Sequence, residues 1–246
     1  MPYPVLFIDD GDVMNDNDLR GSQWQRLVGA FFAPILGGAP ERWAGANRTV
    51  PPRLWEAFHV STSDRVDADY DAFNRAFQLA WLRDMCAEVG VAAPIEEEAI
   101  LRLVHRADAY VTPRVRATYP GVADAIRTLH ARGYHLHTAS GEHSGELDGY
   151  LIGMGVRHCF GRLYGADLVM AHKSGPTFYA RVFADAGVDP ADALVVDDKP
   201  KVLAWAAALG ARTAVVGQAT GDFEPDLRVA SLAALPDAIG VLALVR

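Results

Sequence analysis

In the second half of the chain, short apolar runs alternate with segments in which apolar residues recur at helical spacing. At the start of the chain, four apolar residues, 5–8, predict a fully buried strand of a parallel sheet. Further strands are expected near 134–138, 193–196 and 213–216, with amphipathic helices between them. This order is typical of βαβ units, so the predicted fold class is α/β, with a doubly wound, Rossmann-like parallel sheet.

The stretch 15–115 has a different pattern, because helical spacing continues through it without a strand signal. Phe73, Phe77 and Trp81 recur every four residues and predict the apolar face of a long helix. Residues 34–52 contain several prolines and glycines, and we expect them to form a loop or hinge.

These patterns predict two domains. The α/β core domain is expected to comprise residues 1–14 and 116–246, and residues 15–115 are expected to form a helical insert. A chain of 246 residues is long enough to bury a core of this kind and still carry an insert.

Composition and charge exclude several functional classes. The formal net charge of −8 and the lack of a basic run argue against non-specific binding to nucleic acid. Cys86 and Cys159 are far apart and lack CxxC spacing, which excludes a disulfide scaffold and fits a reducing compartment. No targeting segment or run of about 18 apolar residues is apparent, so we expect a cytoplasmic protein with no membrane partner. The oligomeric state is left open, with a homodimer as one option.

Side chains suited to binding a metal or a phosphate follow three of the predicted strands. They are Asp9, Asp10 and Asp12 after the first strand, Thr138 and Ser140 after the second, and Asp197 and Asp198 after the third. Because parallel strands place their carboxyl ends at one edge of the sheet, these groups are expected to converge. Two acid clusters form the all-oxygen site that Mg²⁺ accepts, and Lys173 would add positive charge for a phosphoryl group. The simpler alternatives are an Asp-rich surface turn, a helix N-cap at Thr138 and a solvated lysine.

Four segments, taken in order, resemble the motifs of the haloacid dehalogenase superfamily, whose members are mostly Mg²⁺-dependent phosphatases. The matching segments are an apolar run ending at Asp9 with Val13 beyond it, Leu136 to Thr138, Lys173 to Pro176, and Leu194 to Asp198. The resemblance extends from residue 4 to about residue 217. One such motif would be weak evidence, whereas four in the expected order are strong evidence.

The resemblance implies a role for each matching residue. Asp9 would be the nucleophile that accepts the phosphoryl group as an aspartyl-phosphate. The substrate's phosphate would be bound by Thr138, Ala139, Ser140 and Lys173, and Thr138 and Lys173 would also stabilise charge in the transition state. Mg²⁺ would be held by Asp9, the carbonyl of Gly11, Asp197 and Asp198. The helical insert would be a cap that closes over the site and selects the substrate.

The first motif departs from the family pattern. Counted from Asp9, the family's second Asp, its general acid/base, falls on Gly11, and the usual glycine falls on Asp12. Glycine has no titratable group, so either Asp10 or Asp12 replaces the acid, or this function is lost. A shift of one residue, with Asp10 as nucleophile, restores the spacing but places Val13 where glycine belongs, so we favour Asp9.

Three functions follow from this departure. The first is a Mg²⁺-dependent phosphatase acting on a small phosphorylated metabolite, which we prefer. The second is a hydrolase of the 2-haloacid dehalogenase type, because a halide leaves without a proton. The third is a catalytically silent member that binds a ligand or a partner. Lys199 and Lys201 follow the paired acids and have no assigned role, although a cation there would weaken Mg²⁺ binding or mimic the ion.

Overall fold

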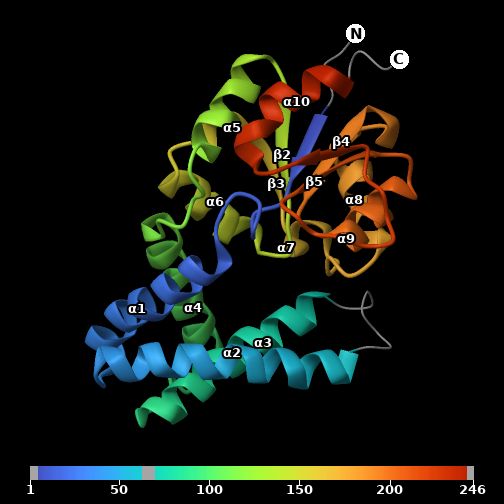
Figure 1. Ribbon diagram of the computed structural model, residues 1–246. Helices are drawn as coiled ribbons and strands as arrows, with labels where there is room; N and C mark the ends of the chain where they lie inside the picture. Colours follow the sequence, from blue (N-terminus) through green and yellow to red (C-terminus); the bar gives the residue numbers. More distant parts are fainter. Residues whose placement is uncertain (1–4, 63–69, 243–246) are drawn as a thin grey trace. The chain divides into compact units, whose positions relative to one another are not determined.

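The computed structural model describes residues 5–62 and 70–242 (Figure 1). The chain divides into two compact units, one formed by Met1–Asn17 with Ala117–Arg246 and the other by Asp18–Arg116. The first unit is an α/β structure and the second is helical. That the helical unit acts as a cap stays a prediction.

The first unit is built on a sheet of six parallel strands within the described residues, in the order β3-β2-β1-β4-β5-β6 (Figure 1). The strands are β1 Val5–Ile8, β2 His135–Ala139, β3 Phe160–Tyr164, β4 Ala193–Asp197, β5 Arg212–Val216 and β6 Leu227–Val229. The helices of this unit are α5 Val122–Ala131, α6 Ser144–Gly153, α7 Ala166–Val169, α8 Pro176–Ala186, α9 Pro200–Ala207 and α10 Leu235–Leu242. The sheet confirms the predicted α/β class, and β1 lies between β2 and β4, where an uninterrupted apolar strand belongs.

Alternate residues of β1 pack into two different apolar cores. Leu6 and Ile8 join a core with residues of α5, α6 and α10. Phe7 joins the other core, with residues of α8 and α9. Because successive side chains of a strand point to opposite faces of the sheet, helices cover both faces. The same alternation decides which acids after β1 can meet.

The helical unit consists of α1 Asn17–Leu36, which begins at the unit boundary, α2 Pro40–Thr62, α3 Tyr70–Val89, α4 Glu97–Val111 and the 3₁₀ turn η1 Thr112–Arg114. None of the helices in the described ranges combines the length and apolar character needed to cross a bilayer.

The prediction of a loop at residues 34–52 is wrong. Only residues 37–39 connect α1 to α2, and Gly37 and Gly38 take positive φ angles there. Trp43 and Val50 are fully buried in α2. Each such burial contributes about 1.5–3 kcal/mol, which offsets part of the cost of about 3 kcal/mol for each of the two prolines inside α2, Pro51 and Pro52.

The aromatic face predicted for α3 is divided between two environments. Trp81 is buried and its ring contacts Phe32 of α1. Phe77 is partly buried and contacts Trp55 of α2, with ring centroids 5.0 Å apart. The Phe73–Phe77–Trp81 spacing therefore does mark the packing face of a helix, as predicted.

Candidate functional site

The carboxyl ends of the three central strands meet at Asp9. Ile8 is in register with Thr138 of β2 on one side and with Val196 of β4 on the other. The Asp9 amide donates a hydrogen bond to the Val196 carbonyl at 2.9 Å, so β1 remains in the sheet up to the acid. Asp9 is thus placed between the polar ends of β2 and β4, as the parallel topology predicts.

Lys173 links the acids of β1 and β4. Its Nζ lies 3.0 Å from Asp9 Oδ1 and 2.6 Å from Asp197 Oδ2, and its side chain is only 8% exposed. Burial alone would lower the pKa of this lysine, but the charges of Asp9 and Asp197 raise the pKa well above its ordinary value. Lys173 is therefore a buried, charged ammonium and not a solvated surface lysine.

The pKa of Asp9 is also raised, and for a carboxyl group this favours the uncharged form. Burial raises its pKa to about 6, helped by the charges of Asp197 and Glu142 and opposed by Lys173 and a hydrogen bond from Ser140. The Tyr179 hydroxyl of α8 is buried beside Lys173, and burial raises its pKa as well. Sequence reasoning missed Tyr179, although its position three residues after Pro176 places it in the first turn of α8.

The paired acids after β4 have different surroundings. Asp197 is fully buried, and its Oδ1 accepts a hydrogen bond from the Lys199 amide at 2.8 Å. Asp198 Oδ1 is buried but accepts no hydrogen bond, and the Lys199 ammonium lies 3.5 Å away from it. Lys201 points elsewhere, with its Nζ 5.9 Å from the centre of the Trp205 ring.

Asp9, Asp197 and Asp198 each offer a carboxylate oxygen, and these oxygens all lie within 4.8 Å of one another. An all-oxygen set suits Mg²⁺, and Asp198 Oδ1 accepts no hydrogen bond that the ion would have to displace, although the Lys199 ammonium lies 3.5 Å from it. The residues therefore fit a divalent cation, while Lys173 already neutralises part of their charge. The Gly11 carbonyl stays a predicted ligand.

Of the two polar side chains at the end of β2, Ser140 is the one that is bonded to Asp9. Thr138 and Ser140 are fully buried, and the Thr138 hydroxyl is 3.5 Å from the Tyr164 carbonyl. The Ser140 hydroxyl bonds to the Glu142 carboxylate and also to Asp9. Ala139 packs in the apolar core next to α8, so its side chain is not available to a substrate.

Asp10 does not join the group around Lys173. Its carboxylate is fully buried and accepts a hydrogen bond from Asn15 Nδ2 at 2.7 Å. Asn15 Nδ2 in turn lies 3.7 Å from the sulfur of Met154, beyond the end of α6. Asp10 thus continues the alternation of β1 on the face of Leu6 and Ile8, which supports Asp9 as the nucleophile.

Asp12 is also engaged outside the group. It accepts hydrogen bonds from the backbone and side-chain amides of Asn17, at 3.2 and 2.7 Å, at the start of α1. Its φ angle is +58°, the left-handed conformation that glycine adopts most readily and Asp tolerates. Asp12 therefore adopts the left-handed backbone conformation that suits the glycine expected at this position of the motif. Gly11 stands at the expected acid/base position and has no titratable side chain.

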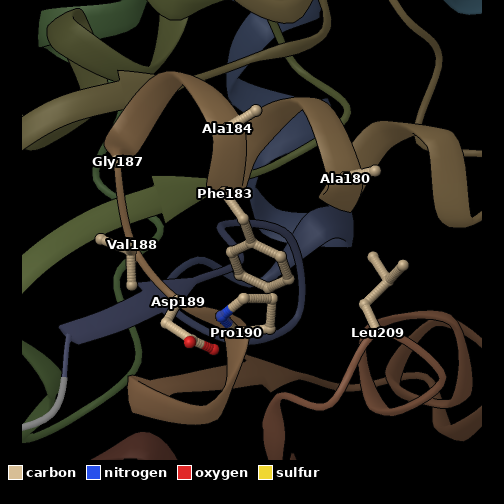
Figure 2. Close-up of a pocket in the computed structure, with 8 residues that line it drawn as sticks. All are labelled: Ala180, Phe183, Ala184, Gly187, Val188, Asp189, Pro190 and Leu209. Atoms are coloured by element: carbon tan, nitrogen blue, oxygen red, sulfur yellow. The ribbon is translucent and has the colours of Figure 1, made fainter.

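A pocket of about 490 Å³ lies on the first unit among α8, the loop after it and Leu209 (Figure 2). Its lining is mainly apolar, with Phe183, Pro190 and Leu209 around it. The one acid on its wall, Asp189, accepts a hydrogen bond from the Ala191 amide. None of the predicted site residues lines this pocket.

Residues 35–210 match the model of a protein family described as haloacid dehalogenase-like hydrolase. The chain belongs to this family, which confirms the resemblance based on its motifs. No curated protein matches the chain significantly in sequence.

Solved structures with the same fold cover both units. The L-2-haloacid dehalogenase from Xanthobacter autotrophicus with chloropropionic acid covalently bound is 17% identical, with a TM-score of 0.61 over 97% of this chain and 98% of that chain. The L-2-haloacid dehalogenase PA0810 is 18% identical, with a TM-score of 0.67 over 97% and 99%. The putative HAD-hydrolase YfnB from Bacillus subtilis bound to magnesium is 16% identical, with a TM-score of 0.63 over 96% and 97%.

Proposed function

We propose that this hydrolase acts on a small 2-haloacid and forms a covalent ester on Asp9. The observation that carries the proposal is the lack of an acid at position 11, together with the hydrogen bonds that hold Asp10 and Asp12 to Asn15 and Asn17. Release of an alcohol from a phosphate ester needs a proton, whereas release of a halide does not. Two of the three similar structures named above are described as L-2-haloacid dehalogenases. The proposal therefore reverses our preference for a phosphatase.

In the first step, an oxygen of Asp9 would attack the carbon that bears the halogen. The carbon–halogen bond breaks, the halide leaves with the bonding electrons, and an ester forms between Asp9 and the acid. Lys173 Nζ lies 3.0 Å from Asp9 Oδ1, and we assign the attack to the other oxygen of Asp9. Water would then hydrolyse the ester, releasing a 2-hydroxy acid and restoring Asp9.

The carboxylate of the substrate needs partners that are not already neutralised. We assign this role to the end of β2, from Thr138 through Ser140, with Lys173 adding positive charge nearby; the Ser140 amide is not one of the donors, because it already bonds to the Tyr164 carbonyl at 3.0 Å.

The test is halide release from both enantiomers of 2-chloropropionate, in EDTA, by the wild-type chain and by Asp9→Asn. We expect turnover of one enantiomer without added metal, and none in Asp9→Asn. Asp198→Asn is the matched control, because the same change removes a carboxylate that the proposed step does not use. Halide release that requires Mg²⁺ or survives Asp9→Asn would contradict the proposal.

A second candidate is a Mg²⁺-dependent phosphatase, and the oxygen of Asp198 without a hydrogen bond favours it. Asp9, Asp197 and Asp198 would hold the ion, which would supply positive charge next to the phosphoryl group. Asp9 would accept the phosphoryl group, and Lys173 would bind its oxygens.

This candidate is separated from the first by a panel of phosphate monoesters with and without Mg²⁺, and by thermal unfolding with the metal alone. A Mg²⁺ site predicts a rise in melting temperature that Asp198→Asn abolishes, equivalent to about 2.7 kcal/mol at 100 times the dissociation constant. Phosphate release with Mg²⁺ and no halide release would replace the first proposal with this one.

A further inference from the structure

A second carboxylate reaches the nucleophile through one hydroxyl. Glu142 follows β2 by three residues, and its side chain is partly buried. Its Oε2 and the Ser140 Oγ are hydrogen-bonded, and the same Ser140 hydroxyl bonds to Asp9. Hydrogen bonds from Glu142 to Ser140 and from Ser140 to Asp9 therefore connect a partly exposed acid with the buried carboxylate on which the ester would form.

The loop that carries Glu142 is fixed by the segment after β3. The Glu142 carbonyl accepts a hydrogen bond from the Ala166 amide at 3.3 Å. Asp167 accepts hydrogen bonds from the backbone amide and the hydroxyl of Ser144, at 2.8 and 2.5 Å. A Cβ on Gly165 would lie 2.3 Å from the Glu142 carbonyl oxygen, so only glycine allows this approach. These contacts fix the backbone of the loop at Glu142.

The hydrogen bonds also restrict where protons are. The Ser140 hydroxyl has one proton and two carboxylate neighbours, Asp9 and Glu142. When it donates to ionised Asp9, its contact with Glu142 is a hydrogen bond only if Glu142 carries a proton and donates it to Ser140. When Asp9 is esterified and uncharged, Ser140 is able to donate to Glu142 instead.

We propose that Ser140 and Glu142 form a proton relay that hydrolyses the Asp9 ester and so replaces the acid/base missing at Gly11. This inference rests on the proposed function and concerns only its second step. Ser140 contacts the reacting carboxyl group, and Glu142 is the terminal base and acid of the relay.

The protons balance as follows. Once Asp9 is esterified, Glu142 is ionised, having released its proton to solvent through its exposed side. Water attacks the ester carbon of Asp9, gives a proton to Ser140, and the Ser140 proton passes to Glu142. The bond between that carbon and the alkyl oxygen then breaks, and the relay returns a proton to the leaving oxygen. Asp9 is left as a carboxylic acid, and its proton passes through Ser140 to Glu142, which restores ionised Asp9 and protonated Glu142.

The experiment separates the two chemical steps in Glu142→Gln with 2-chloropropionate. We expect one equivalent of halide to be released at close to the wild-type rate, followed by turnover at least about 100-fold slower. Mass spectrometry of the stopped reaction should find the ester on the peptide that contains Asp9. Glu142→Asp should recover part of the turnover, which a purely structural role would not explain.

Glu146→Gln is the matched control. Glu146 lies four residues further along, and its carboxylate accepts a hydrogen bond from the His143 amide, so this change perturbs the same loop. It should leave steady turnover close to wild type. Equal turnover in Glu142→Gln and wild type overturns the relay but leaves the proposed function intact. A wild-type chain that releases no halide overturns the proposed function, and the relay with it.

Discussion

The two acid clusters of this site look alike in sequence and differ in structure. After β4, Asp197 and Asp198 both face the group around Lys173, and their oxygens approach that of Asp9 within 4.8 Å. After β1, only Asp9 does so, because Asp10 is bonded to Asn15 on the other face of the sheet. A cluster of acids is therefore not a functional unit in itself.

The difference has two physical causes. At β1 the strand alternation continues through Asp9 and Asp10, so neighbouring acids point to opposite faces. At β4 the chain turns immediately, and the Lys199 amide bonds back to Asp197. The turn brings Asp198 to the same side, although it directly follows Asp197.

The largest expected effect on turnover comes from substituting the two acids after β1, one at a time. Asp9→Asn removes the nucleophile and should reduce turnover by at least about 10³-fold, as is typical for loss of a covalent catalyst. Asp10→Asn should retain turnover per folded molecule, at a cost of about 1–3 kcal/mol in stability, because it disturbs a buried hydrogen bond. Steady-state kinetics and urea denaturation of both variants measure these effects.

The opposite result would exchange the roles. If Asp10→Asn abolished turnover at unchanged stability while Asp9→Asn remained active, the nucleophile would be Asp10. The comparison between the clusters would then be wrong.

The next effect tests the cation that joins the clusters. Lys173→Met keeps most of the side-chain volume but leaves Asp9 and Asp197 buried without their ion pair. We expect a loss of about 3–5 kcal/mol in the free energy of unfolding, measured in urea. Lys201→Met is the control, since Lys201 is exposed and its Nζ lies 5.9 Å from the centre of the Trp205 ring. Equal losses in the two variants would show that Lys173 is not needed to stabilise the site.

Much of this site was predictable because parallel topology leaves few choices. Apolar runs that end in polar residues predicted the β1, β2 and β4 ends, and the sheet order places them side by side. Lys173 is separated from them in sequence; it was proposed as a positive charge for a phosphoryl group, and the family resemblance supported that role. Its depth of burial was not predictable, since a lysine in a loop is usually solvated.

Other features depend on contacts that a sequence pattern does not give. The prolines and glycines at 34–52 indicated a loop, but the burial of Trp43 and Val50 favours a helix. Asp10 and Asp12 were candidates for the missing acid, yet each has an asparagine partner a few residues later. Glu142 was not among the predicted site residues, because its link to Asp9 depends on the orientation of Ser140.

A pH profile gives a smaller effect that also distinguishes the acids. Asp9 attacks only as a carboxylate, and its pKa is raised to about 6, first by burial. Halide release in a single turnover should therefore fall about tenfold per pH unit below 6 and level off above it. Ser140→Ala removes a hydrogen bond that lowers this pKa, so the fall should begin at higher pH. A profile that is flat down to pH 4 would contradict the assignment.

The smallest effect concerns Asp12, the acid in the place of the family's glycine. Asp12→Ala removes the hydrogen bonds to Asn17 and keeps a side chain at φ +58°, whereas Asp12→Gly removes the same bonds and relieves that backbone conformation. Thermal unfolding should therefore find the glycine variant more stable than the alanine variant by about 1 kcal/mol. Both should release halide at the wild-type rate, because the carboxylate of Asp12 is engaged with the start of α1 and not with Asp9. If either variant lost turnover while remaining folded, Asp12 would be the missing acid, and both clusters would then contribute more than one carboxylate to the chemistry.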